Sequence, residues 1–353
     1  MNFSPSAPQN RGMAVIFVLI AITVLSIMAG LFAYSMKVET RLAANANDDE
    51  QLLWIGRAGV ERARWILALE GQVPFTDKNQ IWAGGPGEGP ETNGPLNGIS
   101  LDNFPVGDGT VSLKMTELES KINVNRADTP IIQQVLTTMG VDAATISVVS
   151  DSIQDWVDSD DATRPAGAES DYYQGLPHPY FAKNAPMDDI SELLLVKGVT
   201  PEMFKGGGAT NDADAAFQHH HLGFGNAPGD TPDYPFGLQD VFTPFSSGQV
   251  NLNTADENVL QCIPGMDTTS VENILKFRSG EGGGDGSSAF QSLGQLGSIV
   301  NPTALAQIQR YCTVRGSTYE VHAIAQIGDF KREYIAILFR NGPNVQVVSF
   351  HWN

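Results

Sequence analysis

The hydrophobic pattern of the chain begins with an uncharged run over Met13–Met36. A run of this length crosses a hydrocarbon core of ~30 Å as one helix. It does not end in a small-residue cleavage site, as a secretory signal does, but continues into an amphipathic stretch. Apolar residues recur there every three or four positions over Leu52–Leu67, until Gly71 and Pro74 end the pattern. The pattern predicts one helix over about Met13–Glu70.

This helix would be roughly 85 Å long at 1.5 Å per residue. Its first half suits lipid, and its second half offers an apolar face on which a domain packs. Gly56 and Gly59 lie on that second half, where small residues let the backbone of a partner subunit approach closely. We therefore expect the helix to serve both as an anchor and as a lateral packing surface.

Alternation with a period of two predicts strands after this helix. The predicted strands are at 109–117, 318–327, 332–339 and 345–352. The long stretch between the first and second of them has helical periodicity. We expect an α+β protein, with a long N-terminal helix and an antiparallel sheet that is split in sequence by a large inserted α-helical domain. The expected units are helix and first strands at 37–117, the insert at 118–312, and the closing strands at 313–353.

The insert contains a repeat, at 121–153 and 248–278. Each copy opens with Asn, an apolar residue and Asn, and two helices joined by a short turn follow. Asn125 and Asn253 fit the end of a short strand, and Asp next to the start of a helix is favourable. This plan is SAM-like or helix-hairpin-helix-like, and it is more typical of a scaffold than of an active site.

A helix-hairpin-helix also raises the alternative of a membrane-tethered DNA-binding receptor for DNA uptake. Such hairpins present backbone N–H groups to a phosphate. Here the hairpin places Asp267 where the phosphate would approach. The net charge of −19 over 353 residues also disfavours binding to nucleic acid.

No arrangement of nucleophile, base and orienting group stands out in the sequence, and no glycine-rich phosphate loop follows a strand. We expect no enzymatic activity and no catalytic residues.

The start of the chain resembles a type IV prepilin, with a short leader at 1–12 that ends in Gly12 just before the apolar run. The resemblance implies a type IV pilin-like fold, cleavage and methylation at Gly12 and Met13, and retention of 13–36 as the transmembrane part of the helix. Most such proteins have Glu where this chain has Phe17. A buried carboxylate is retained only where it has a partner. Absence of this Glu is typical of one class of pilin-like proteins, the K class of pseudopilins.

The middle of the chain strengthens this resemblance. The stretch 151–199 contains an Asp-Trp pair with an acidic run, then Gly-Ala-Glu, Asp-Tyr-Tyr, Asn-Ala-Pro and a Glu-Leu helix that leads to Gly198. With the N-terminal helix and the final strands, it resembles the K class of minor pseudopilins of the type II secretion system over nearly the whole chain.

This resemblance implies a non-enzymatic subunit at the tip of the pseudopilus, which initiates its assembly for export of folded proteins. The implied partners are the minor pseudopilins of the I and J classes, the major pseudopilin, the prepilin peptidase and the inner-membrane assembly platform. The implied location is the inner membrane, crossed once, with the C-terminal body in the periplasm. Phe17 is the residue implicated in assembly.

The acidic run offers clustered carboxylates on a loop, at Asp158, Asp160, Asp161, Glu169 and Asp171. Hard oxygen ligands of this density suit Ca²⁺. The spacing is not that of an EF-hand, because Ala162 and Thr163 stand where an acid and Gly belong. A solvated acidic loop is the alternative, and the use of calcium by the resembled family favours a calcium site.

The chain has two cysteines, Cys262 and Cys312. Two buried free thiols are one interpretation of them. A periplasmic location would permit a disulfide, and we expect the two to pair.

Overall fold

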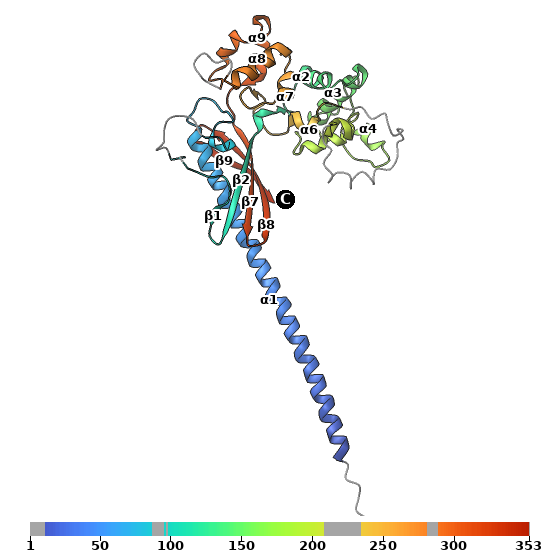
Figure 1. The fold of residues 1–353 in the computed structure, drawn as a ribbon. Helices are drawn as coiled ribbons and strands as arrows, with labels where there is room; N and C mark the ends of the chain where they lie inside the picture. The colour runs from blue at the N-terminus through green and yellow to red at the C-terminus, as the bar shows by residue number, and fades with distance from the viewer. Residues whose placement is uncertain (1–10, 87–94, 97, 208–233, 281–288, 353) are drawn as a thin grey trace, which may run out of the picture.

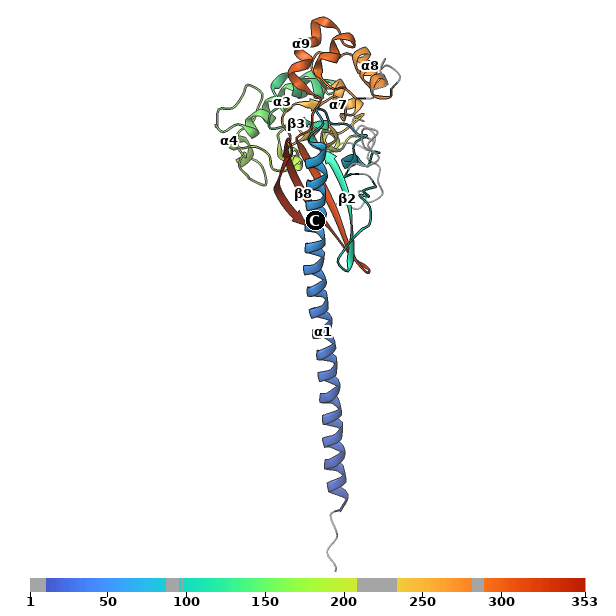
Figure 2. The same cartoon turned by 90° about the vertical axis from the view of Figure 1, so that its left-hand side faces the viewer.

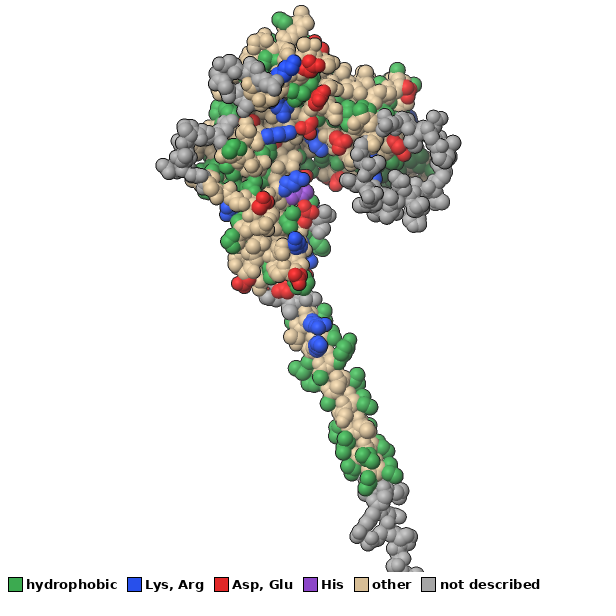
Figure 3. Space-filling model, in the orientation of Figure 1, with side chains coloured by type: hydrophobic (Ala, Val, Ile, Leu, Met, Phe, Trp, Pro, Cys, Tyr) green, Lys and Arg blue, Asp and Glu red, His purple; other side chains and the backbone are tan. Residues whose placement is uncertain are grey.

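A single straight helix dominates the computed structural model, which describes residues 11–86, 95–96, 98–207, 234–280 and 289–352. Helix α1 spans Arg11–Glu70, as the sequence pattern predicts. Its N-terminal half extends away from the rest of the molecule (Figure 1). Hydrophobic side chains surround that free half (Figure 3), and it is long and apolar enough to cross a membrane.

The other half of α1 packs on an antiparallel sheet of five strands in the order β1-β2-β7-β8-β9. The strands are β1 (Phe104–Val106), β2 (Gly109–Glu117), β7 (Thr318–Ile327), β8 (Phe330–Asn341) and β9 (Asn344–Trp352). Strand β2 pairs with β7 over Thr110–Glu117, although the two are separated in sequence by the helical stretch. The short 3₁₀ helix η1 (Ile81–Ala83) follows α1 and lies against both α1 and β2.

The face between α1 and the sheet is the first hydrophobic core. A Cβ on Gly56 would lie 2.2 Å from a ring carbon of Tyr334, and one on Gly59 would lie 2.8 Å from Val111. The expectation that these glycines admit a partner subunit is therefore wrong. They let α1 approach its own sheet, because Tyr334 and Val111 fill the space beside them.

The segment between β2 and β7 forms a second body with its own hydrophobic core. This body lies at the end of the sheet opposite the free half of α1 (Figures 1 and 2). Its helices are η2 (Leu118–Ser120), α2 (Thr129–Thr138), α3 (Ala143–Val157), α4 (Ser170–Gln174), η3 (Ile190–Leu195), α5 (Pro201–Lys205), α6 (Leu238–Val241), α7 (Glu257–Gln261), α8 (Thr268–Arg278), η6 (Leu293–Ser298) and α9 (Pro302–Tyr311).

Two short parallel strand pairs also lie in this body. They are β3 (Ile122–Asn123) with β4 (Phe242–Thr243), and β5 (Val250–Asn251) with β6 (Cys312–Thr313). The sequence pattern indicated the first strand of each pair but not its partner, because the partner lies far along the chain and is only two residues long.

Each pair belongs to one copy of the repeat. An equivalent asparagine makes the same pair of backbone hydrogen bonds within each copy. Asn125 accepts a hydrogen bond from Met187 N at 2.7 Å and donates to Met187 O at 2.9 Å. Asn253 accepts from Phe290 N at 2.7 Å and donates to Phe290 O at 2.9 Å. Each asparagine thus fastens the end of its strand to the segment that follows the two helices, so the repeat extends beyond the stretch recognised in the sequence.

Candidate functional site

The acidic loop connects α3 to α4 within the first copy of the repeat. Asp158 follows the last turn of α3, and Glu169 immediately precedes α4. Ligand oxygens of Asp158, Asp160 and Glu169 lie within 4.8 Å of one another. The fold therefore brings together three of the five carboxylates that the sequence suggested.

Glu169 is the most enclosed of the three, with 3% of its surface exposed. Neither of its carboxylate oxygens has a hydrogen-bond partner within the described part of the chain, and the same is true of Oδ1 of Asp158. Burial raises the pKa of Glu169 to about 7, and the neighbouring Asp155 and Asp158 act in the same direction. Buried carboxylate oxygens with no donor are costly unless a cation compensates them. The cluster fits a divalent cation on this ground.

Arg164 holds the loop from one side. Its Nη1 donates to Oδ1 of Asp155 at 2.7 Å and to Oδ2 of Asp158. Gly167 leaves room for this arrangement, because a Cβ there would lie 2.0 Å from Oδ2 of Asp155. One oxygen of Asp158 is thus fixed by Arg164, while the other remains available on the side of Asp160 and Glu169.

The other two predicted ligands lie outside this group. Asp161 is exposed and accepts a hydrogen bond from Nδ2 of Asn184 at 2.8 Å. Asp171 is exposed in the first turn of α4. Of the five predicted ligands, these two therefore lie apart from the group of three, because spacing along a loop does not show which side chains turn inward.

Asn184 also belongs to this site, although no pattern in the sequence indicates it. Its Nδ2 also donates to the carbonyl oxygen of Asp160 at 3.1 Å, and its Oδ1 is buried without a partner among the described residues. Its φ of 48° lies in the left-handed region, which Asn tolerates better than most residues. Carboxylate and amide oxygens alone form this donor set, and such a set suits Ca²⁺ rather than Zn²⁺.

The cysteine prediction requires a correction. Cys262 and Cys312 are both buried and both free. Cys262 is the residue that follows α7 and lies near Thr138 of α2, whereas Cys312 begins β6 opposite Val250. Burial raises the pKa of Cys262 to about 12 and that of Cys312 as well. The disulfide is not formed, since different neighbours hold the two thiols, and both act as small core residues.

The two hairpins carry no vacant phosphate site. Gly140 and Gly265 adopt positive φ angles at the turns, and Asp142 and Asp267 follow as N-cap residues. Oδ1 of Asp267 accepts from Ser270 N at 2.7 Å, and Ser270, through its side chain and then its backbone N–H, lowers the pKa of the carboxyl group. In each hairpin a carboxylate already occupies the helix N-terminus that a phosphate would need, which argues against the DNA-receptor alternative.

The residues predicted for maturation and assembly all lie on the free half of α1. Gly12 and Met13 belong to its first turn, and Phe17 is 69% exposed. The structure places them at the end of the molecule farthest from the inserted body (Figure 1).

The fold that these elements define is pilin-like, with a long helix on an antiparallel sheet and a helical insert. Residues 110–206 match the family model described as type II secretion system (T2SS), protein K. Type II secretion system protein K of Pseudomonas aeruginosa is 23% identical over 345 residues, covering 94% of this chain and 89% of that protein. The chain is thus similar to type II secretion system protein K, over one segment in the family model and over most of its length in the Pseudomonas relative.

Two further comparisons point to the same similarity. The protein K of Aeromonas hydrophila is 26% identical over 220 residues, covering 57% of this chain. That match spans 62% of the length of the Aeromonas relative, which is less than two thirds. A solved GspK-GspI-GspJ complex from enterotoxigenic Escherichia coli contains a chain with a TM-score of 0.58 and 15% identity, covering 88% of this chain and 99% of that one. This likeness confirms the α+β fold.

Proposed function

We propose that the chain is a minor pseudopilin at the tip of the type II secretion pseudopilus, where it initiates assembly for export of folded proteins. The observation that carries this proposal is the position of the inserted body. It lies beyond the end of the sheet opposite the membrane helix (Figures 1 and 2). A subunit stacked above would meet this body, so the chain fits the end of a filament better than its shaft.

Phe17 supports the same placement. In the apolar interior of a filament, a bare charge is retained only where a partner neutralises it. This chain has an apolar ring there instead. We infer that no subunit above presents an amine to it, and that the role is structural rather than enzymatic.

The proposed partners are the minor pseudopilins of the I and J classes, because the similar protein GspK is found in a complex with GspI and GspJ. The major pseudopilin and the inner-membrane assembly platform are further proposed partners. The free half of α1 would cross the inner membrane once, with the sheet and the insert in the periplasm.

Maturation should precede this assembly. We propose that prepilin peptidase cleaves between Gly12 and Met13 and that the new N-terminus is methylated. Intact-mass measurement on protein isolated from membranes should show loss of the first twelve residues and the mass of one methyl group. A chain that still begins at Met1 would contradict this maturation.

We also propose that the acidic loop binds calcium. Asp158, Asp160 and Glu169 would hold the ion, with Oδ1 of Asn184 available as a fourth donor. When bound, calcium supplies the positive charge that the buried oxygens of Glu169 lack. A fixed loop would hold α3 and α4 together within the tip body.

The tip assignment is tested with full-length chains in membranes. Co-expression with the I and J partners, followed by detergent extraction, should yield a complex with one copy of each, as measured by light scattering. Phe17→Glu should reduce secretion, because the new carboxylate has no amine to meet, and Phe17→Leu is the matched apolar control. Recovery of homopolymers, or enrichment of Phe17→Glu along the shaft with normal secretion, would overturn the assignment.

A further inference from the structure

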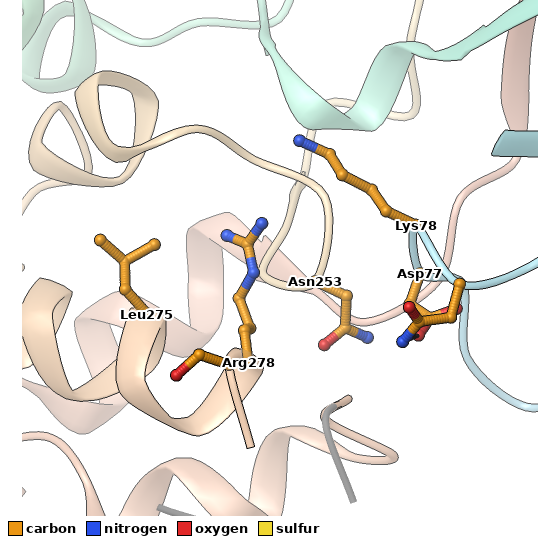
Figure 4. A pocket seen from close by; sticks show the side chains of 7 residues that line it. Asp77, Lys78, Asn253, Leu275 and Arg278 are labelled. Carbon is orange, nitrogen blue, oxygen red and sulfur yellow. Dashed lines mark hydrogen bonds between the residues drawn. The ribbon is translucent and has the colours of Figure 1, made fainter. Parts of the chain in front are cut away.

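A cavity of about 250 Å³ lies where the loop after α1 meets the second copy of the repeat. Its lining comes from both bodies and consists of Asp77, Lys78, Asn79, Asn253, Leu275, Arg278 and Ser279. Figure 4 shows the side chains of Lys78 and Arg278 extending into the same space from opposite sides. Two cations thus face one cavity at the seam between the bodies.

Arg278 is the more restrained of these cations. Its Nη1 donates to the carbonyl oxygen of Ala255 at 2.6 Å, which fixes the plane of the guanidinium group. Among the described residues, no carboxylate lies within 4.0 Å of it. Burial lowers the pKa of Arg278, while Asp256 and Asp77 act in the opposite direction from farther away. The guanidinium is thus partly buried at the cavity and has no ion-pair partner among the described residues.

Lys78 contributes a second charge. Its ammonium group lies 3.0 Å from Oδ1 of Asp256, and both side chains are more than half exposed. An exposed pair of this kind is weak and opens readily. Lys78 can therefore contact a ligand in the cavity without breaking a strong interaction.

The remaining walls restrict what can bind. Both hydrogen-bonding atoms of the Asn253 amide are used by Phe290, so this side chain shapes the cavity and does not recognise a ligand. Leu275 offers an apolar surface beside Arg278 (Figure 4). Asp77 also lines the cavity, and its charge disfavours an anion that carries more than one negative charge.

We propose that this cavity binds a single carboxylate group, held by the guanidinium of Arg278 and by Lys78. A guanidinium binds a planar carboxylate through two parallel N–H···O bonds. Leu275 would accept the aliphatic carbon next to the carboxylate. The group comes either from a free organic acid or from an acidic side chain or C-terminus of a neighbouring protein. Its binding would join the sheet-bearing body to the insert.

The first measurement uses the full-length chain in detergent with sodium acetate and sodium propionate as probes. Binding to the folded state alone must raise the melting temperature. Either salt should raise it by about 1–2 °C above sodium chloride of the same ionic strength, if occupancy adds about 1 kcal/mol. Phosphate should give less, because of Asp77.

Substitutions then test whether acetate acts at this cavity. Arg278→Gln should weaken acetate binding about tenfold or more, since it removes the charged fork. Lys78→Gln should weaken it less, and it provides an independent test at an exposed position if Arg278→Gln folds poorly. The control is Lys276→Gln, on the same helix and 60% exposed. An acetate effect no larger than that of chloride, or one kept in both cavity variants, would overturn the proposal.

A second measurement identifies the source of the carboxylate. If a neighbouring protein supplies it, Arg278→Gln should weaken association with the I and J partners, and acetate should compete with that association. If a free acid supplies the carboxylate, neither Arg278→Gln nor added acetate should change association with the I and J partners. The acetate measurement needs no partner, so its failure is distinguishable from failure of the tip assignment.

Discussion

Replacing Glu117 by Gln should make the stability of the chain less dependent on pH. Glu117 ends β2, is 1% exposed, and accepts hydrogen bonds from Asn251 Nδ2 at 3.3 Å and from the Thr254 hydroxyl. It thus joins the sheet to the second copy of the repeat. Burial, with a further contribution from Glu119, raises its pKa to about 8, although Arg340 and the two hydrogen bonds act against this.

The sign follows from proton linkage. Between the ordinary pKa of 4.5 and about 8, the folded chain holds a proton on Glu117 that the unfolded chain has lost. The free energy of unfolding therefore falls as pH rises through this window, by about 1.4 kcal/mol per pH unit, and levels off above it. The whole effect is about 5 kcal/mol. Glutamine cannot ionise, so Glu117→Gln removes this contribution to the pH dependence of stability.

The assay is urea unfolding of the detergent-solubilised chain, followed by tryptophan fluorescence at pH 5 and pH 9. Relative to the parent chain, Glu117→Gln should gain about 4 kcal/mol between pH 5 and pH 9, which is a shift in urea midpoint of about 1.3 M for a slope near 3 kcal/mol/M. Glu61→Gln, at an exposed position, is the control and should show no such gain. An equal difference between Glu117→Gln and the parent at both pH values would refute the reasoning.

Three further predictions concern the loop, the thiols and the helix. Calcium should raise the melting temperature by several degrees in scanning fluorimetry, and a chelator should reverse this gain. Glu169→Gln should remove most of the gain, whereas the control Asp171→Asn should retain it. Maleimide should label Cys262 and Cys312 only after denaturation without reductant, and failure to label them then would mean that they are paired. Gly56→Val should destabilise the chain by about 1–3 kcal/mol in urea, because the side chain would collide with the sheet; an unchanged midpoint would show that the helix does not pack there.

Much of the fold could be predicted because it is encoded locally. The uncharged run over Met13–Met36 and the period of three to four residues over Leu52–Leu67 indicate one helix without reference to any other segment. Alternation likewise located β2, β7, β8 and β9. The repeated Asn-apolar-Asn pattern indicated two related units, although the strand partners of each unit lay too far along the chain to be recognised.

The sites depended on contacts between distant segments. The sequence showed an acidic loop, but only folding brought Asn184 against Asp160 and left Asp171 outside. The sequence also left two interpretations of the cysteines open, and the fold separated their environments.

The sequence by itself determined the long helix, the split sheet and the family resemblance, because periodicity and motif spacing are properties of neighbouring residues. The tertiary structure alone decided that Gly56 packs on Tyr334, and that Lys78 and Arg278 share one cavity. Those outcomes depend on how side chains about two hundred residues or more apart fill the same space, and close packing admits only arrangements in which their shapes and charges agree.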